Sequence, residues 1–115
     1  MESECIFCRI VSGAIPSRKA AETDQVFAFH DIAPQAPTHI LIIPKRHVAD
    51  SAADLGTEHA VLLADLFGVA ARLAREHKLE RGWRLVTNVG AEAGQSVHHL
   101  HLHLLGGRPM RWPPG

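Results

Sequence analysis

Four of the nine histidines lie between Val97 and Leu104, in the run His-His-Leu-His-Leu-His. Successive side chains of a β-strand point to opposite faces, so His99, His101 and His103 are expected to line one face and the alternating leucines the other. A rise of about 3.3 Å per residue places these imidazoles roughly 6 to 7 Å apart. Such a row can grip one phosphoryl group from several sides. A core strand with hydrogen-bonded histidines is the plainer interpretation, but each buried imidazole would then need its own partner.

Imidazoles in this arrangement can bind metal, move protons or attack an electrophile. Neutral imidazole attacks phosphorus readily, and the phosphorus–nitrogen bond that forms is labile enough for water to complete the turnover. A catalytic metal held by all three histidines is the alternative, but alternate residues of one strand lie nearly in a line and wrap awkwardly around one ion. Neighbouring donors would stabilise charge on the non-bridging oxygens. The sequence therefore favours nucleophilic catalysis at phosphorus.

The composition is that of an ordinary globular domain. The 12 acidic and 12 basic residues of the 115 balance, so the summed charge gives no general reason to bind nucleic acid or an anionic membrane. The N-terminus lacks the basic and then apolar pattern of a signal peptide, and no apolar run approaches the length of a membrane span. We therefore expect a cytoplasmic protein of one domain over residues 1–115, with residues 108–115 as an irregular Pro-rich tail.

Strand patterns recur along the chain. Residues 18–30 are expected to form two short strands, and a Pro-containing loop at residues 30–37 follows them. The apolar run His39–Ile43, stopped by Pro44, has the pattern of a central strand covered on both faces. Trp83–Val89 alternates and is expected to form an antiparallel hairpin with the histidine strand.

Two helices are expected. Ser3 can cap a short helix that runs through Val11 and ends at Gly13 in a left-handed C-cap. A long helix from a Thr57 cap to about Lys78 carries two neighbouring apolar stripes. The stripes are Leu62, Leu66, Val69 and Leu73, and Leu63, Phe67, Ala70 and Ala74. One sheet face needs only one stripe, so the second is expected either to pack within the domain or to contact the same helix of a second subunit.

Cys5 and Cys8 have Cys-x-x-Cys spacing, one helical turn apart. A redox pair is one interpretation, but bulky Ile6 and Phe7 separate the thiols and no cation adjoins Cys5 to lower its pKa. Two unrelated buried thiols are a second. We favour half of a zinc site completed by histidines elsewhere, because a closed tetrahedron needs two more soft or imidazole ligands.

The turn before the histidine strand offers further polar contacts. Gly94 removes a side chain where a phosphate would approach backbone N–H groups. Asn88 is expected at the mouth of the hairpin, close to Gln95 and Ser96.

The run from Gly94 to Leu105, Gly-Gln-Ser-Val-His-His-Leu-His-Leu-His-Leu-Leu, resembles the signature of the histidine triad (HIT) superfamily of nucleotide hydrolases and transferases. The likeness covers nearly the whole chain. Further segments that resemble the family are Cys5–Cys8, Phe29–Ile32, Pro37–His39 and Pro44–His47. The ending Leu-Gly-Gly-Arg at residues 105–108, continued by Trp-Pro-Pro-Gly, resembles the Hint branch, the histidine triad nucleotide-binding proteins.

The resemblance implies an α+β, HIT-like fold: an antiparallel sheet of about five strands, one long helix and a short N-terminal helix, in a two-fold homodimer whose sheets join. It implies hydrolysis of purine nucleoside 5'-phosphoramidates, AMP-type adenylated amines, through a nucleotidyl-histidine intermediate and without an organic cofactor. The alternatives are a dinucleoside polyphosphate hydrolase and a nucleotide-binding or scaffold module with little catalysis.

The resemblance also implies catalytic roles by position. His101 corresponds to the nucleophile, His99 and His103 flank the α-phosphate, and His39 supports the triad or its phosphate. Ser96 is implied as a contact to the phosphate or the leaving group.

Nucleotide contacts are implied around these residues. Gln95 would touch the phosphate or leaving group, with Asn88 and Gly94 nearby. Asp31 resembles the acceptor of the ribose hydroxyls, which suits an ionised carboxylate because it only accepts hydrogen bonds. Apolar residues would line a base pocket: Ile6, Phe7, Ile10, Phe29, Ile32 and Leu41. Simple core packing is the alternative for each of them.

In the related uridylyltransferases a Cys-x-x-Cys pair and two histidines hold zinc. Transferred by position, this structural zinc site consists of Cys5, Cys8, His47 and His99. The metal would make His99 a structural strut, which competes with its role beside the phosphate, and the sequence leaves both roles open. Alternation points His98 to the face opposite His101, and we assign it no catalytic role.

Overall fold

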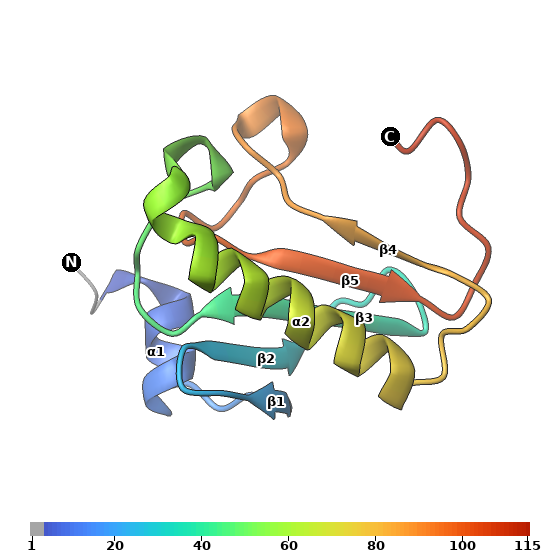
Figure 1. Ribbon diagram of the computed structural model, residues 1–115, viewed down its shortest axis with the longest axis horizontal. Helices are drawn as coiled ribbons and strands as arrows, with labels where there is room; N and C mark the ends of the chain where they lie inside the picture. Colours follow the sequence, from blue (N-terminus) through green and yellow to red (C-terminus); the bar gives the residue numbers. More distant parts are fainter. Residues whose placement is uncertain (1–3) are drawn as a thin grey trace.

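The computed structural model describes residues 4–115, and within them five antiparallel strands form one sheet in the order β1-β2-β3-β5-β4. The strands are β1 Lys19–Glu22, β2 Val26–His30, β3 Thr38–Pro44, β4 Trp83–Val86 and β5 Leu102–Gly106. The helices are α1 Ile6–Ser12 and α2 Ala60–Glu76, with short 3₁₀ helices at Ala52–Asp54, Thr57–His59 and Ala91–Ala93. The long α2 crosses one face of the sheet, and the short α1 lies at the other (Figure 1). The expected α+β fold is confirmed.

Strand alternation divides the apolar side chains into two cores. In β2, Val26 and Ala28 pack toward α2, whereas Phe27 and Phe29 pack toward Phe7 of α1. The same alternation runs through β3, where the odd-numbered side chains face α1. Both faces of the central strands are therefore covered, which explains why β3 is continuously apolar after His39.

The ends of the helices differ in part from the sequence prediction. Ser3 lies outside the described residues, and the N-cap of α1 is Cys5, whose Sγ accepts the backbone N–H of Cys8 at 3.3 Å. The C-cap prediction is confirmed, because Gly13 is left-handed with φ 87°. The expected start of the long helix at Thr57 is wrong, since a 3₁₀ turn precedes α2 and no side-chain cap at Thr57 begins it.

The histidine strand begins later than expected. Regular pairing starts at Leu102, so His99 and His101 lie in an extended bend before β5 and only His103 lies within it. The antiparallel register would bring Leu100 opposite Pro44, which has no N–H to donate to the ladder. The alternation nevertheless continues through the bend, because Leu100, Leu102 and Leu104 all enter the core beneath α2.

Strand β4 is also shorter than expected and ends at Val86 rather than Val89. Its antiparallel pairing with β5 is confirmed, but residues 87–101 form a longer connection than a simple turn. Residues after Gly106 form neither helix nor strand. Among the described residues, no helix combines the length and apolar character needed to cross a membrane.

Of the second apolar stripe of α2, Ala70 and Ala74 are buried within the domain. Leu63 is partly buried against the same core, and Phe67 is 56% exposed. The stripe is therefore used mostly inside the fold and leaves one large aromatic ring at the surface.

Candidate active site

The triad histidines lie on the α1 side of the sheet, between a sulfur-containing cluster and a hydrogen-bonded cluster. The ring of His101 stands 5.0 Å from that of His103 and 5.0 Å from that of Phe7, measured between centroids. The ring of Phe7 also contacts His99, edge to face, at 5.8 Å. The three histidines thus share one face, as alternation predicted, despite the late start of β5.

A backbone carbonyl fixes the tautomer of His101. Its Nδ1 lies 2.7 Å from the carbonyl oxygen of His99, and a carbonyl can only accept, so Nδ1 carries the proton. The neutral ring then has its lone pair on Nε2. His101 is buried against Phe7, which limits the ring to this orientation. This is the protonation state that a nitrogen nucleophile requires.

A chain of hydrogen bonds fixes the tautomer of His103. The backbone N–H of Gln35 donates to Nδ1 of His39 at 3.0 Å, so the proton of neutral His39 must be on Nε2. His39 Nε2 in turn lies 2.9 Å from Nδ1 of His103 and donates to it. His103 therefore carries its own proton on Nε2 and can offer it to an oxygen of a substrate.

Burial keeps this chain neutral. Desolvation, together with the neighbouring His101 and His39, lowers the pKa of His103 to about 4. Desolvation also lowers the pKa of His39, and the nearby Asp31 only partly opposes it. Both imidazoles are consequently uncharged at neutral pH, as the donor-to-acceptor order requires.

Asp31, His39 and His103 bring ligand-type atoms together, but their hydrogen bonds do not suit a metal. A metal on Nε2 of His39 would displace its proton to Nδ1, where the N–H of Gln35 already donates. Asp31 Oδ1 accepts the N–H of Ala33 at 2.8 Å, and Oδ2 lies 3.4 Å from His39 Nε2. The cluster acts as an ordered set of donors and acceptors.

The second cluster consists of Cys5, Cys8, His47 and His99, whose ligand atoms all lie within 4.8 Å of one another. Nδ1 of His99 lies 3.2 Å from Sγ of Cys5 and 3.6 Å from Sγ of Cys8, and Nδ1 of His47 lies 4.0 Å from Sγ of Cys8. Zinc bonds of about 2.3 Å to sulfur and 2.0 Å to nitrogen at tetrahedral angles place such atoms roughly 3.5 Å apart. The donor set therefore fits zinc.

The outer nitrogens of both cluster histidines are held. His99 Nε2 donates to the carbonyl oxygen of Pro44 at 2.9 Å, and His47 Nε2 donates to Asp50 Oδ1 at 2.6 Å. In its neutral form each ring therefore directs the lone pair of Nδ1 at the sulfurs, as metal-ligating histidines do. Because His99 is fully buried with both nitrogens engaged, neither is directed at a substrate.

Local contacts also set the charge of this cluster. Burial alone would raise the pKa of the Cys5 thiol, but hydrogen bonds from the backbone and side chain of Cys8 and from His47 lower it. The hydrogen bond to Asp50 raises the pKa of His47. Both shifts favour the charged forms, a Cys5 thiolate beside a His47 imidazolium, and a bound metal would take the place of the proton on His47 Nδ1.

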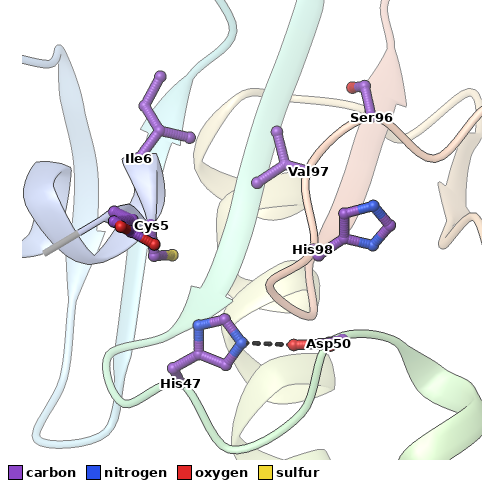
Figure 2. A pocket seen from close by; sticks show the side chains of 8 residues that line it. Cys5, Ile6, His47, Asp50, Ser96, Val97 and His98 are labelled. Carbon is purple, nitrogen blue, oxygen red and sulfur yellow. Dashed lines mark hydrogen bonds and ion pairs between the residues drawn. The ribbon is translucent and has the colours of Figure 1, made fainter. Parts of the chain in front are cut away.

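A hollow of about 370 Å³ opens beside this cluster. Figure 2 shows Cys5 and Ile6 on one side of it, Ser96 and His98 across from them, and His47 joined to Asp50 below. Its lining consists of Glu4, Cys5, Ile6, His47, Asp50, Ser96, Val97 and His98. His98 is exposed and lines this hollow, whereas alternation from Leu100 and Leu102 would have placed it beneath α2.

The polar turn residues are placed as follows. Gln95 accepts the N–H of Gly90 and donates to the carbonyls of Asp50 and Val97, so its side chain ties the turn together. Gly94 is left-handed with φ 94°, which accounts for glycine there. Asn88 is partly buried and Ser96 is exposed. Their contacts with a substrate stay predictions.

The apolar residues implied for a base pocket separate into two groups. Phe7, Phe29 and Leu41 are buried in the core between the sheet and α1, and Ile10 packs partly buried against them. Ile6 and Ile32 are exposed, Ile32 fully. Core packing accounts for the first group, and the second presents most of the apolar surface that these residues expose to solvent.

Several groups that organise the site escaped the sequence analysis. Backbone atoms of Gln35, Pro44 and His99 hold the three key imidazoles, and no residue type signals such a role. Asp50 is different, because an acid three residues after a candidate metal-ligating histidine is a recognisable signal for a supporting contact.

We expect His103 to titrate near pH 4 rather than near its ordinary value of 6.5. The unfolded chain would take up this proton near pH 6.5 and the folded chain only near pH 4, so this group lowers folding stability as pH falls between those values and has no effect above them. Ring chemical shifts followed by NMR against pH measure the midpoint, with the signal assigned by its loss in His103→Asn. A midpoint close to 6.5 would contradict the shift.

Comparisons with known proteins agree with this arrangement. The family model described as HIT domain matches residues 12–110. The chain is 49% identical to the 14 kDa zinc-binding protein of Zea mays, over 99% of this chain and 90% of that protein. It is 45% identical to Adenylylsulfatase HINT1 of Arabidopsis thaliana, over 99% of this chain and 78% of that protein. The structure of a HIT family hydrolase from Legionella pneumophila Philadelphia 1 superposes with a TM-score of 0.94 at 50% identity, covering 97% of this chain and all of that one. The chain belongs to the HIT domain family, among its Hint-like members.

Proposed function

We propose that this chain is a HIT hydrolase that cleaves purine nucleoside 5'-phosphoramidates or related adenylated amines. The observation that carries the proposal is the hydrogen bond from His101 Nδ1 to the His99 carbonyl, which leaves the Nε2 lone pair for attack. The adjacent His103 offers an N–H for a phosphate oxygen. The HIT domain match and the hydrolase named among the similar structures support a hydrolytic role.

The proposed reaction has two displacements at the α-phosphorus. In the first, the Nε2 lone pair of His101 forms a bond to phosphorus while the bond to the amine breaks, and the amine leaves with the bonding electrons and a proton taken up from solvent. In the second, water attacks phosphorus and gives a proton back to solvent, and the bond between phosphorus and Nε2 breaks with its electrons returning to Nε2, which releases the nucleoside monophosphate. His103 stabilises charge on a non-bridging oxygen in both steps, and His39 holds it in place.

The proposed nucleotide contacts follow from the groups still open to solvent. The partly exposed Asp31 would accept the ribose hydroxyls, and exposed Ser96 would meet the phosphate or leaving group. Ile6 and Ile32 have exposed apolar surface to offer a purine.

Replacing His101 by Ala should lower turnover of an adenosine phosphoramidate by at least about a thousandfold, because no other group then supplies the nucleophile. AMP binding, measured by calorimetry, should remain. His98→Ala is the matched control, since this exposed histidine lies three residues away and outside the proposed chemistry. Turnover of the His101 variant close to that of the parent protein would contradict the mechanism.

The leaving group needs a separate experiment. The same nucleotidyl transfer to His101 could release an amine, a nucleotide or, as the name of the Arabidopsis relative suggests, sulfate. Rates on an adenosine phosphoramidate, a diadenosine polyphosphate and adenylyl sulfate should be compared side by side. Faster cleavage of either of the last two would replace the phosphoramidate assignment. Nucleotide binding without adenylated protein after rapid quench would instead indicate a binding module.

We also propose a structural zinc held by Cys5, Cys8, His47 and His99. The sulfur-to-nitrogen distances, the engaged outer nitrogens and the hydrogen bonds that lower the pKa of the Cys5 thiol support it. The name of the Zea mays relative points the same way. Bound there, zinc would cross-link α1 to the bend before β5, and His99 would be a strut.

Protein purified without chelator should contain about one zinc per chain by elemental analysis. Cys8→Ser should lower the zinc content and the melting temperature, because a serine hydroxyl is a poor zinc ligand at neutral pH. His98→Gln serves as the control, since His98 lines the same hollow outside the ligand set. Metal-free parent protein with two titratable thiols would refute the site.

We propose further that the chain forms a homodimer through the α2 and β4 side of the fold. Phe67 of α2 and Trp83 of β4 are 56% and 42% exposed. Strand β4 lies at the edge of the sheet and pairs only with β5 among the described strands. An exposed aromatic ring on an edge strand, as Trp83 is on β4, is suited to a two-fold contact.

Sedimentation should give a mass near twice that of one chain at micromolar concentration. Phe67→Asp should shift the protein toward monomer, because a charge would replace a ring buried at the interface. Val48→Asp, a partly exposed apolar position elsewhere, should leave the mass unchanged. A monomeric parent protein would overturn the dimer.

A further inference from the structure

Arg108, in the tail after β5, reaches the loop that supports His39. Its Nε and Nη2 atoms donate to the carbonyl oxygen of Gln35 at 3.2 and 3.1 Å, and Nη1 donates to the carbonyl of Pro109 at 3.0 Å. Two donors from one rigid guanidinium on a single carbonyl restrict where that carbonyl can lie. The N–H of the same residue, Gln35, donates to His39 Nδ1.

We propose that Arg108 is a positioning residue for His103. By holding Gln35, it keeps the Gln35 N–H on His39 Nδ1, and through His39 it sets the proton of His103 on Nε2, facing the substrate. The proposal rests on the phosphoryl transfer proposed for His101.

The backbone beside Arg108 packs on the same loop. Gly107 has φ 92°, and a Cβ added there would lie 2.9 Å from Cβ of Pro37. Within the loop, Ala33 and Asp31 are joined by a hydrogen bond, and the Gln35 side chain donates to the Ala33 carbonyl. The loop is therefore internally braced, and the tail after β5 anchors it at Pro37 and at Gln35.

The consequence reaches the reacting phosphate because each neutral imidazole has one proton. If Gln35 moves away, His39 Nδ1 loses its donor and can carry the proton itself. Nε2 of His39 then becomes an acceptor, and His103 must turn its proton onto Nδ1 to meet it. Nε2 of His103 would then present a lone pair, in place of an N–H, to the phosphate. The lone pair and the negatively charged phosphate oxygen repel each other.

The activity test compares two arginines. Arg108→Met should lower kcat about tenfold, part of the loss expected for an oxyanion donor, with little change in KM. Arg108→Lys should recover part of kcat, because one donor can still reach the carbonyl. Arg81 and Arg108 line one surface hollow of about 320 Å³, apart from the hollow beside the cysteines. Arg81→Met removes a charge from it, and the structure shows no bond from Arg81 to the loop that carries Gln35. Equal losses of kcat in the Arg81 and Arg108 variants would overturn the proposal.

A spectroscopic test does not depend on turnover. Ring ¹⁵N shifts of the parent protein should show His39 and His103 protonated on Nε2 alone, and Arg108→Met should show a mixture of tautomers at both rings. Unchanged tautomers in that variant would refute the positioning role. If the parent protein turns over no nucleotide substrate, the proposed function fails, but the nitrogen shifts still decide the role of Arg108.

Discussion

The hydrogen bond between the His101 ring and the His99 carbonyl is the contact on which the rest of the site depends. It holds only if the backbone at His99 stays in place. The buried His99 ring secures that backbone, since it is fixed between the Pro44 carbonyl and the cysteine sulfurs. The N-terminal helix, far from the triad in sequence, is thereby joined to the nitrogen that performs the proposed attack.

The two clusters that flank His101 both use histidine imidazoles, but in different roles. On one side, His47 and His99 turn their Nδ1 atoms toward sulfur, an arrangement suited to a metal. On the other, His39 and His103 form a directional series of donors and acceptors that ends in an N–H. Burial lowers the pKa of both His39 and His103 and so keeps the two rings neutral. The series needs neutral rings, because a charged imidazole carries protons on both nitrogens and cannot accept a hydrogen bond.

Alternation of side chains predicted the division of the sheet into two faces, because facing depends only on the extended backbone. The length of the histidine strand was not predictable from that run alone, since pairing also depends on Pro44 in another strand. The prediction that Thr57 caps the long helix was wrong, because Thr57 is the first residue of a 3₁₀ helix that precedes α2. A hydroxyl residue before an apolar run is compatible with either start. The roles of Gln35 and of the His99 carbonyl could not be predicted from the sequence, because both act through backbone atoms that every residue possesses.

The two-faced sheet also restricts how the chain length can vary. A single residue inserted between His101 and Leu104 would reverse the facing of every side chain on one side of it. His103 would then enter the apolar layer beneath α2, or Leu104 would leave that layer for the imidazoles. Within these strands, only insertions or deletions of two residues keep each side chain on its face of the sheet. Differences in length are therefore expected in the connections between strands and not within β3 and β5.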